Sequence, residues 1–401
     1  MTTRTASRAE IDHLIAEHYR AEGDALVAAA RALGDRIRAE ADDIERERSL
    51  SAPLVKALKE AGIFRMGMPR AWGGPEADVL TQVRVIEELS RADGSVGWCA
   101  MIGSAGGYFT AFLDDAVGRE LYADLDAVTA SVIRPTGRAV VVKGGYRVSG
   151  RWTFASCCQH STWFVSGCTP VDGDQPRQSP SGGPEVRVCY VPADRCTILD
   201  TWTTTGLRGS GSHDYIVDDV FVPAEHTFSL TGPVLREGPL YTLPTMYLAG
   251  PVGVPLGIAR AAIDTVIALA ETKTIRFGGG LRDEAYAQMA VARAEGLLGS
   301  ARGFVFDVLD DLWRSLTKGE PLSPQQRARY RLCLVTAAEQ SIEAVDLMYT
   351  AGGGASLYAT NPLDRYLRDV HTVHQHHVFS PKVREVTGRM LLGLEPNAPN
   401  Y

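Results

Sequence analysis

A candidate strand ends in residues suited to binding a flat ring. The segment 150–156 reads Gly-Arg-Trp-Thr-Phe-Ala-Ser, so Trp152, Phe154 and Ser156 stand at every second position. Alternate residues of a strand share a face, which would put two aromatic rings and one hydroxyl against a planar ligand with a polar edge. A core strand whose serine caps a turn fits the same pattern, and on local grounds this second interpretation is favoured.

A loop rich in glycine and hydroxyl groups precedes another candidate strand. Residues 206–214 read Gly-Leu-Arg-Gly-Ser-Gly-Ser-His-Asp. Backbone amides, hydroxyls and the guanidinium of Arg208 could together hold a phosphate. The spacing is neither that of a P-loop nor that of a dinucleotide fingerprint, and no helix follows. A tight turn with Arg208 in a structural ion pair is equally compatible.

The C-terminal part carries a glycine turn and a histidine cluster. Gly352 and Gly353 permit close approach of the backbone to a ligand, although a helix C-cap is the simpler interpretation. Four of the nine histidines lie between residues 371 and 377. We expect no metal there, because a tetrahedral site needs further ligands that the sequence does not offer.

One histidine of this cluster is a candidate acid or base. Arg365, Asp369 and His376 stand at i, i+4 and i+11, so on a continuous helix they lie on nearly the same side. His376 could then face a buried pocket, where its pKa near physiological pH suits proton transfer. A solvated helix end is the alternative.

The elements that must position these residues fall into three zones. Helix formers dominate up to about residue 125, with helices expected over residues 10–47, 53–64 and 78–90. Strands follow, beginning with a hairpin over residues 140–148 and continuing over 163–168, 186–191 and 215–222. Long helices return from about residue 240, with Ser323-Pro324 and Asn361-Pro362 as start signals.

Composition narrows the class of protein. A length of 401 residues and a charge of −7 indicate a multidomain globular protein without the basic face that nucleic acid requires. The N-terminus shows no apolar signal region, and the apolar stretch over residues 246–259 is too short to span a bilayer. Seven cysteines at irregular spacing indicate reduced thiols. We therefore expect a cytoplasmic protein with no membrane or nucleic-acid partner.

The order of these motifs resembles the acyl-CoA dehydrogenase superfamily over nearly the whole chain. The resemblance is closest to two-component flavin monooxygenases, such as p-hydroxyphenylacetate hydroxylase oxygenase components, steroid-catabolic phenol hydroxylases and dibenzothiophene monooxygenases. The matching residues are Gly97-Trp98, the 150–156 strand with His160, the 206–214 loop followed by Val220-Phe221-Val222-Pro223, Gly352-Gly353, and Asn361-Pro362-Leu363 through Arg368-Asp369 to Gln375-His376.

The resemblance implies an α+β fold with three domains, usually assembled as a homotetramer. These are an N-terminal helical domain (1–127), a middle β-barrel (128–232) and a C-terminal four-helix bundle (233–401). It also implies reduced flavin (FMN or FAD) and O2 as cofactors, with a C4a-(hydro)peroxyflavin as oxidant. A separate NAD(P)H-dependent flavin reductase and a small, aromatic or heteroatom-bearing substrate would be the partners.

By the same resemblance, individual residues take roles. Ser156, near flavin N5, and His376 are the expected catalytic residues. The expected cofactor-binding residues are Ser131, Thr136, Trp152, Phe154, Ser156, Arg208, Gly209, Ser210, Ser212, Gly352, Gly353 and Arg368. The expected substrate pocket comprises Trp98, Gly106, His160 and His376.

Missing carboxylates favour oxygenation over dehydrogenation. A dehydrogenase of this superfamily uses a glutamate base, yet residues 247–255 contain no acid and residues 373–376 read Val-His-Gln-His. Many monooxygenases of this kind carry a second pocket histidine at the position where this chain has Gly106. A glycine in place of that histidine would enlarge the pocket or remove a hydrogen bond. A dehydrogenase or oxidase, and a silent flavin-fold partner protein, remain the alternatives.

Overall fold

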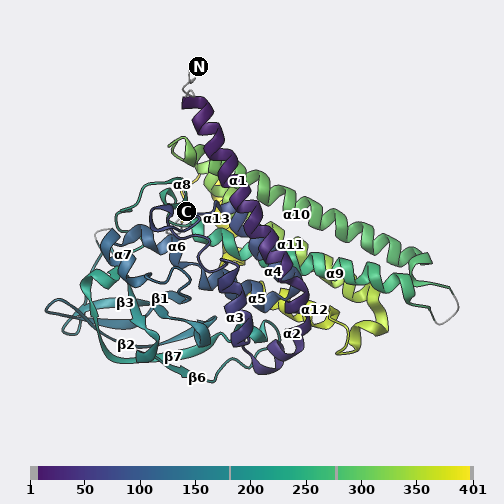
Figure 1. Cartoon of the computed structure of the whole chain (residues 1–401), viewed down its shortest axis with the longest axis horizontal. Helices are drawn as coiled ribbons and strands as arrows, with labels where there is room; N and C mark the ends of the chain where they lie inside the picture. Colours follow the sequence, from purple (N-terminus) through teal and green to yellow (C-terminus); the bar gives the residue numbers. More distant parts are fainter. Residues whose placement is uncertain (1–7, 180–181, 276–278, 398–401) are drawn as a thin grey trace, which may run out of the picture.

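The computed structural model describes residues 8–179, 182–275 and 279–397, with side chains from Arg20 onward. Helices form both ends of the chain, and the strands between them gather on one side of the molecule (Figure 1). The expected α+β order of helices, then strands, then helices is confirmed.

The N-terminal helices are α1 (Arg8–Ala32), α2 (Gly34–Glu47), α3 (Ala52–Glu60), α4 (Val79–Ala92), α5 (Gly94–Gly103), α6 (Gly106–Phe109) and α7 (Asp115–Leu121). Three of them, α1, α3 and α4, begin within two residues of the starts expected from the sequence. Ser51 and Asp78 cap α3 and α4 by accepting first-turn N–H groups. The helical structure expected over residues 10–47 is confirmed, and it is divided at Leu33 into α1 and α2.

The strands form one eight-stranded sheet. They are β1 (Thr129–Val142), β2 (Gly145–Ala155), β3 (Trp163–Asp172), β4 (Gln175–Pro176), β5 (Arg187–Pro192), β6 (Thr197–Leu199), β7 (His213–Pro223) and β8 (Thr227–Phe228). Their order is β6-β7-β2-β1-β3-β5-β8, with β4 on β3. The expected hairpin is confirmed: β1 and β2 are antiparallel, and Gly144 takes a φ of +83° in the turn.

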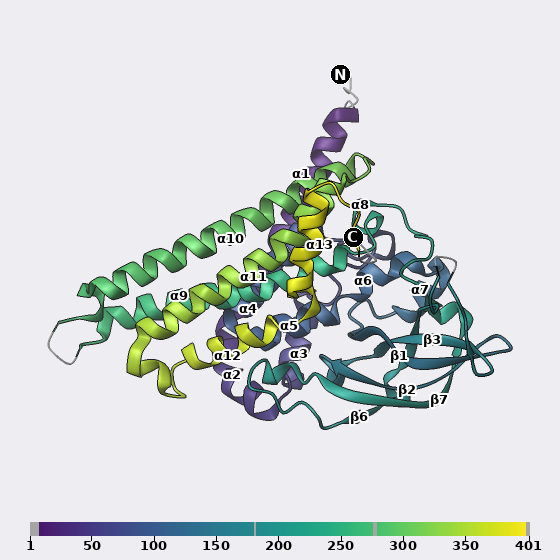
Figure 2. The ribbon, with the colours of Figure 1, turned by 180° about the vertical axis from the view of Figure 1, so that it is seen from behind.

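The C-terminal helices pack as a bundle beside the sheet. They are α9 (Gly253–Thr272), α10 (Ala285–Thr317), α11 (Pro324–Gly352), α12 (Leu363–Val373) and α13 (Pro381–Leu391). Both views show α9, α10 and α11 running alongside one another (Figures 1 and 2). Ser323 caps α11 through a capping box with Gln326, as predicted. The long last helix expected after Asn361 is wrong, since α12 has 11 residues and ends at Val373.

The most apolar helical stretch joins the bundle to the N-terminal helices. Met246–Thr272 is long and apolar enough to cross a membrane by length and composition, so the expected limit at residue 259 is wrong. Yet 67% of its most apolar window is buried inside the protein, where α9 packs against α4, α10 and α11. This is the pattern of a core helix.

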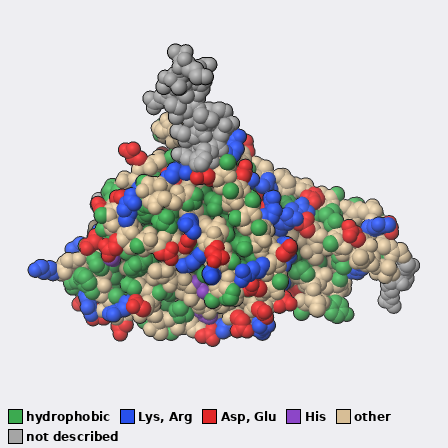
Figure 3. Space-filling view, viewed as in Figure 1, with side chains coloured by type: hydrophobic (Ala, Val, Ile, Leu, Met, Phe, Trp, Pro, Cys, Tyr) green, Lys and Arg blue, Asp and Glu red, His purple; other side chains and the backbone are tan. Residues whose placement is uncertain are grey.

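On the face shown in Figure 3, acidic and basic side chains are interspersed.

Candidate active site

Three buried serines form a chain of hydrogen bonds where sheet and helices meet. Ser156, directly after β2, has its Oγ 2.7 Å from that of Ser212, which lies 2.7 Å from the Oγ of Ser210. Trp98 of α5 donates its Nε1–H to Ser156 Oγ at 2.8 Å. All four residues are buried. The structure thus brings together four predicted site residues from two distant segments and an N-terminal helix.

The end of β2 is irregular. The pairing of β2 with β7 shifts between Trp152 and Ala155, and Phe154 and Cys157 have φ angles of +65° and +64°. Left-handed backbone is uncommon for residues other than glycine and marks strain that the surroundings must maintain. The side chain of Phe154 is 68% exposed and makes a T-shaped contact with Trp202, so much of its ring is available to a ligand.

This irregularity separates residues that we expected on one face. Trp152 is fully buried in the core of the sheet, where it stacks on Tyr215 at 5.0 Å and donates Nε1–H to Gly167 O. Phe154 points to the surface instead. The expected shared face, and with it a place for Trp152 beside a bound ring, is wrong because the bulge breaks the two-residue alternation.

His376 packs against the same tryptophan from the bundle side. Its ring centroid lies 5.3 Å from that of Trp98, at an interplanar angle of 79°. Among the described residues, its buried Nδ1 has no hydrogen-bond partner. Burial, with smaller contributions from the charges of His377 and Arg331, lowers the pKa of His376 to about 3. The imidazole is therefore neutral at pH 7 and suited to hydrogen bonding.

The helical face expected to carry this histidine does not exist. Because α12 ends at Val373, His376 follows the helix with extended backbone. Arg365 points instead to Asp42, which it contacts at 2.7 Å. Asp369 points to the 206–214 loop, where its Oδ1 accepts the N–H of Leu207 at 2.6 Å. His376 is therefore positioned by the extended segment after α12 and not by a helical face shared with Arg365 and Asp369.

Arg331 is a site residue that sequence reasoning missed. It lies on α11 and is 6% exposed, and its positive charge lowers the pKa of both His376 and His377. The helix that carries it packs against residues 377–379. In the sequence it stands in a run with Arg327 and Arg329, and only burial distinguishes it from these neighbours.

The 206–214 loop is fixed by close contacts with helices. A Cβ on Gly206 would stand 2.1 Å from the carbonyl oxygen of Arg368, and one on Gly209 would stand 2.1 Å from Ile44 Cγ2. Both glycines therefore permit packing against α12 and α2, which is a different role from the phosphate contact expected of Gly209. Arg208 donates to the carbonyl oxygens of Glu45 and Thr204.

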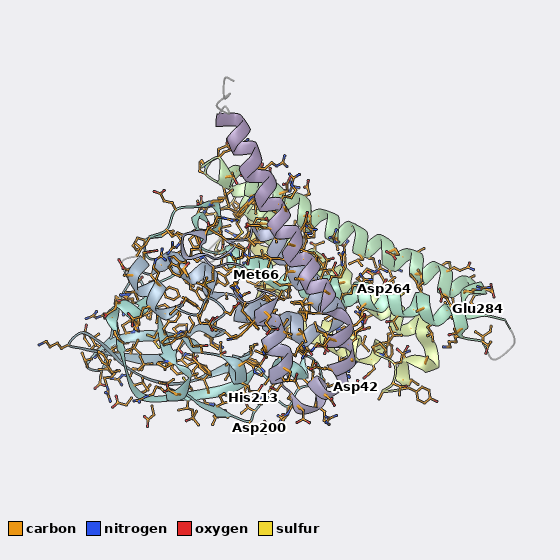
Figure 4. All side chains as sticks on the ribbon, in the orientation of Figure 1. Asp42, Met66, Asp200, His213, Asp264 and Glu284 are labelled. Atoms are coloured by element: carbon orange, nitrogen blue, oxygen red, sulfur yellow. The ribbon has the colours of Figure 1, made fainter. Side chains whose placement is uncertain are left out.

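His213 fixes the other end of this loop. Its Nδ1 accepts the N–H groups of Thr201 and Trp202, both at 3.2 Å, and burial lowers its pKa. Asp200, which lies beside it in Figure 4, pairs with Arg48 of the N-terminal helices. The loop is therefore held from both sides before it delivers Ser210 and Ser212.

The predicted residues of α11 and α12 lie apart from the serine chain. Gly353 ends α11 with a φ of +55°, and Lys273 donates to the carbonyl oxygen of Gly352, so this turn is a helix end as the simpler interpretation held. Arg368 pairs with Glu45 and Asp364. It lines, with Arg208, an open groove of about 360 Å³ between α2 and α12.

Four further predicted residues have diverse environments. Ser131 on β1 has a buried Oγ without a partner among the described residues, whereas Thr136 is exposed. His160 contacts Ser49 Oγ at 3.2 Å, and burial lowers its pKa to about 4. A Cβ on Gly106 would stand 2.4 Å from the Tyr122 hydroxyl, so the extra pocket space expected at Gly106 is wrong.

These features fit a flavin. The buried atoms Ser131 Oγ and His376 Nδ1 call for hydrogen-bond partners, since buried polar groups are normally satisfied. Phe154 offers an exposed aromatic face, and Ser156 offers a hydroxyl oxygen two residues along the chain. A planar ring system with polar edges is complementary to this set.

Family models match both helical parts of the chain. The acyl-CoA dehydrogenase N-terminal domain matches residues 20–117, and the acyl-CoA dehydrogenase C-terminal domain matches residues 249–381. Indole-3-acetate monooxygenase of Pseudomonas putida is 32% identical over 372 residues, covering 92% of this chain and 93% of that protein. The flavin-dependent monooxygenase oxygenase subunit HsaA of Rhodococcus jostii is 30% identical, covering 86% and 92%.

Solved structures agree with the sequence relatives. XiaF from Streptomyces sp., in complex with FADH2 and glycerol, superposes with a TM-score of 0.88 at 26% identity and covers 96% of this chain and 99% of its own. The 3-HSA hydroxylase from Rhodococcus sp. RHA1 superposes with a TM-score of 0.86 at 27% identity, covering 94% and 99%.

Fold and site together define a flavin-dependent oxidoreductase. The chain belongs to the acyl-CoA dehydrogenase family, and within that family to the two-component flavin-dependent monooxygenases. The resemblance inferred from its motifs is confirmed. The preference for oxygenation, argued from the missing carboxylates, agrees with the names of these relatives.

Proposed function

We propose that this chain is the oxygenase component that uses reduced flavin and O2 to insert one oxygen atom into a small aromatic substrate. The observation that carries the proposal is the position of Trp98. Its indole donates to Ser156 and packs edge-on against His376, so both expected catalytic residues contact the same side chain. We infer that they line one compartment around Trp98.

When bound, reduced flavin supplies the electrons that activate O2. Ser156 would hold the polar edge of the ring, and Phe154 its face. The neutral imidazole of His376 would hydrogen-bond the oxygen being transferred or orient a substrate hydroxyl. A pKa of about 3 makes this imidazole too weak a base to carry a proton at neutral pH. The buried side chains of Trp98, Cys99 and Cys157 would exclude water from this compartment.

An aromatic substrate with an acidic group fits the electrostatics. Burial and, to a smaller extent, the charge of the buried Arg331 lower the pKa of both His376 and His377. We infer that this positive charge would favour an anionic substrate beside the two histidines. Two of the relatives are named indole-3-acetate monooxygenases, and that substrate is an aromatic acid. We infer a small aromatic acid as the preferred class.

The remaining assignments extend the proposal. Relatives are described with FADH2 or with FMN, so either flavin is a candidate cofactor. Names such as oxygenase subunit and oxygenase component support a separate reductase, which would be NAD(P)H-dependent. A cytoplasmic location and a homotetramer complete the proposal.

Turnover with an added flavin reductase tests the substrate class. Aromatic acids should be turned over better than their amides or methyl esters, and Arg331→Gln should raise KM for the acids while changing kcat little. Lys382→Gln on the surface of α13 serves as the charge-matched control. An equal KM for acids and amides in the wild type would contradict the assignment of an acidic substrate.

A further inference from the structure

The serine chain has one possible direction of hydrogen bonding. The Oγ of Ser210 lies 2.7 Å from the carbonyl oxygen of Leu207. A carbonyl oxygen has no proton, so Ser210 must donate this bond. Each hydroxyl has a single proton, and therefore Ser210 has none left for Ser212. The bond of 2.7 Å between Ser210 and Ser212 must then be donated by Ser212.

The same count extends to Ser156. Because Ser212 has used its proton on Ser210, the 2.7 Å bond between Ser156 and Ser212 must be donated by Ser156. Trp98 supplies an N–H that Ser156 accepts at 2.8 Å. Counting the hydrogen bonds of the described residues, Ser156 is left with no proton to donate and one free lone pair. Toward any further group it can act only as an acceptor.

The carbonyl group of Leu207, which sets the direction of these hydrogen bonds, is itself held in place. Leu207 has a left-handed backbone with a φ of +48°, and its N–H donates to the buried carboxyl of Asp369 at 2.6 Å. Its carbonyl oxygen also accepts the Nε1–H of Trp202 at 2.9 Å. The peptide groups on both sides of Leu207 are therefore fixed, and the carbonyl cannot turn away from Ser210 without breaking these bonds.

We propose that Ser210 and Ser212 make this site selective for reduced over oxidised flavin by fixing the direction of the Ser156 hydroxyl proton. The inference rests on the proposed function, in which Ser156 meets the N5 edge of the ring. Reduced flavin has an N5–H that donates to the free lone pair of Ser156. Oxidised flavin has a bare N5, which would place two acceptors against each other.

The selectivity has a use in a two-component system. An oxygenase fed by a separate reductase meets both redox forms of the flavin, and only the reduced form reacts with O2. Rejection of the oxidised form keeps the site open for the next reduced molecule. In this account Ser210 and Ser212 act through Ser156 and are positioning residues.

Removing either hydroxyl should release the proton of Ser156. In Ser212→Ala, Ser156 loses its acceptor and can donate to oxidised flavin. In Ser210→Ala, Ser212 is free to turn toward Ser156, which again frees the Ser156 proton. Ser166→Ala is the matched control, since it removes another buried serine hydroxyl, bonded to Tyr215 at 2.6 Å within the sheet core.

The experiment is an anaerobic titration of each variant with oxidised and reduced FMN and FAD. The ratio of the two Kd values, oxidised over reduced, should fall about three- to tenfold in Ser210→Ala and Ser212→Ala, as expected for one hydrogen bond. The midpoint potential of the bound flavin should move negative by about 15–30 mV, at about 30 mV per tenfold. Ser166→Ala should change neither.

A ligand-side measurement covers variants that fail to fold. Reduced 5-deazaFMN has carbon in place of N5 and offers no N–H, so the wild type should bind it with no preference over the oxidised analogue. A preference that persists with 5-deazaFMN, or a ratio within twofold of wild type in both serine variants, would overturn the proposal. Failure of the wild type to bind either form of normal flavin would overturn the proposed function as well.

Discussion

The indole nitrogen of Trp98 and the hydroxyl oxygen of Ser156 are 2.8 Å apart, and this contact joins an N-terminal helix to the irregular end of β2. Through Ser212 and Ser210 the connection continues to Leu207, which Asp369 holds from the bundle. All three parts of the fold thus meet in one hydrogen-bonded path. The precision of the site depends on how they dock.

Replacing Trp98 with Phe should test this junction. Phe keeps a ring against His376 but removes the N–H that Ser156 accepts, which should cost about 1 kcal/mol of unfolding free energy in addition to lost packing. Reduced-flavin affinity should fall as well. Trp163→Phe, which removes an indole bond to Leu121 O at 2.8 Å, should lose similar stability with unchanged affinity. Equal affinity in both variants would argue against a role for the junction.

His376→Ala should leave flavin binding intact while reducing coupled product about 10²-fold or more, the usual size of such contributions. Hydrogen peroxide should rise correspondingly, because oxygen would be reduced without transfer to substrate. The exposed His371→Ala is the control. Unchanged product per flavin oxidised in His376→Ala would remove His376 from the mechanism.

His376 should also make stability depend on pH. Its pKa is about 3 in the folded protein and about 6.5 when unfolded. Below pH 6.5 the unfolded chain binds a proton that the folded protein does not, so stability falls as pH drops from about 6.5 toward 3. The loss between pH 7.5 and 5 is about 2 kcal/mol. Urea unfolding of His376→Asn should show a shallower decline than wild type and His371→Asn; identical slopes would contradict this assignment.

Asp369 should tolerate loss of charge better than loss of its acceptor. Burial, with the charge of Asp93, raises the pKa of its carboxyl, so Asp369→Asn removes little that the fold depends on. Asp369→Ala leaves the Leu207 N–H without its acceptor, at a cost of about 1–3 kcal/mol. Denaturant midpoints of the two variants compare these effects. Equal destabilisation would show that Leu207 is held by other contacts.

Local signals in the sequence predicted many of the helices, strands and turns of this molecule. The capping box at Ser323, the turn at Gly144 and the strand over 186–191 depend on neighbouring residues, and the structure has each of them. The order of motifs was sufficient to indicate the family. The predicted Ser156, Trp98 and His376 do come together.

Long-range contacts decided what the sequence did not predict. Trp152 and Phe154 point to different sides of the sheet because the pairing of β2 with β7 contains a bulge. Gly209 is needed where the loop packs closely against Ile44. Asp369 and Arg331 are ordinary charged residues of helices until burial gives them a role. No periodicity or spacing distinguishes such residues, since the partner that defines each lies far away in the chain.

The most direct test of the proposed function is the source of oxygen in the product. The protein, loaded anaerobically with reduced FMN or FAD, would be mixed with ¹⁸O2 and small aromatic acids. The masses of the products would then be measured by mass spectrometry. An oxygenase predicts a product with one ¹⁸O atom from O2, formed with no more than one equivalent of the supplied flavin. Only hydrogen peroxide and unchanged substrate, or a desaturated product without label, would contradict it.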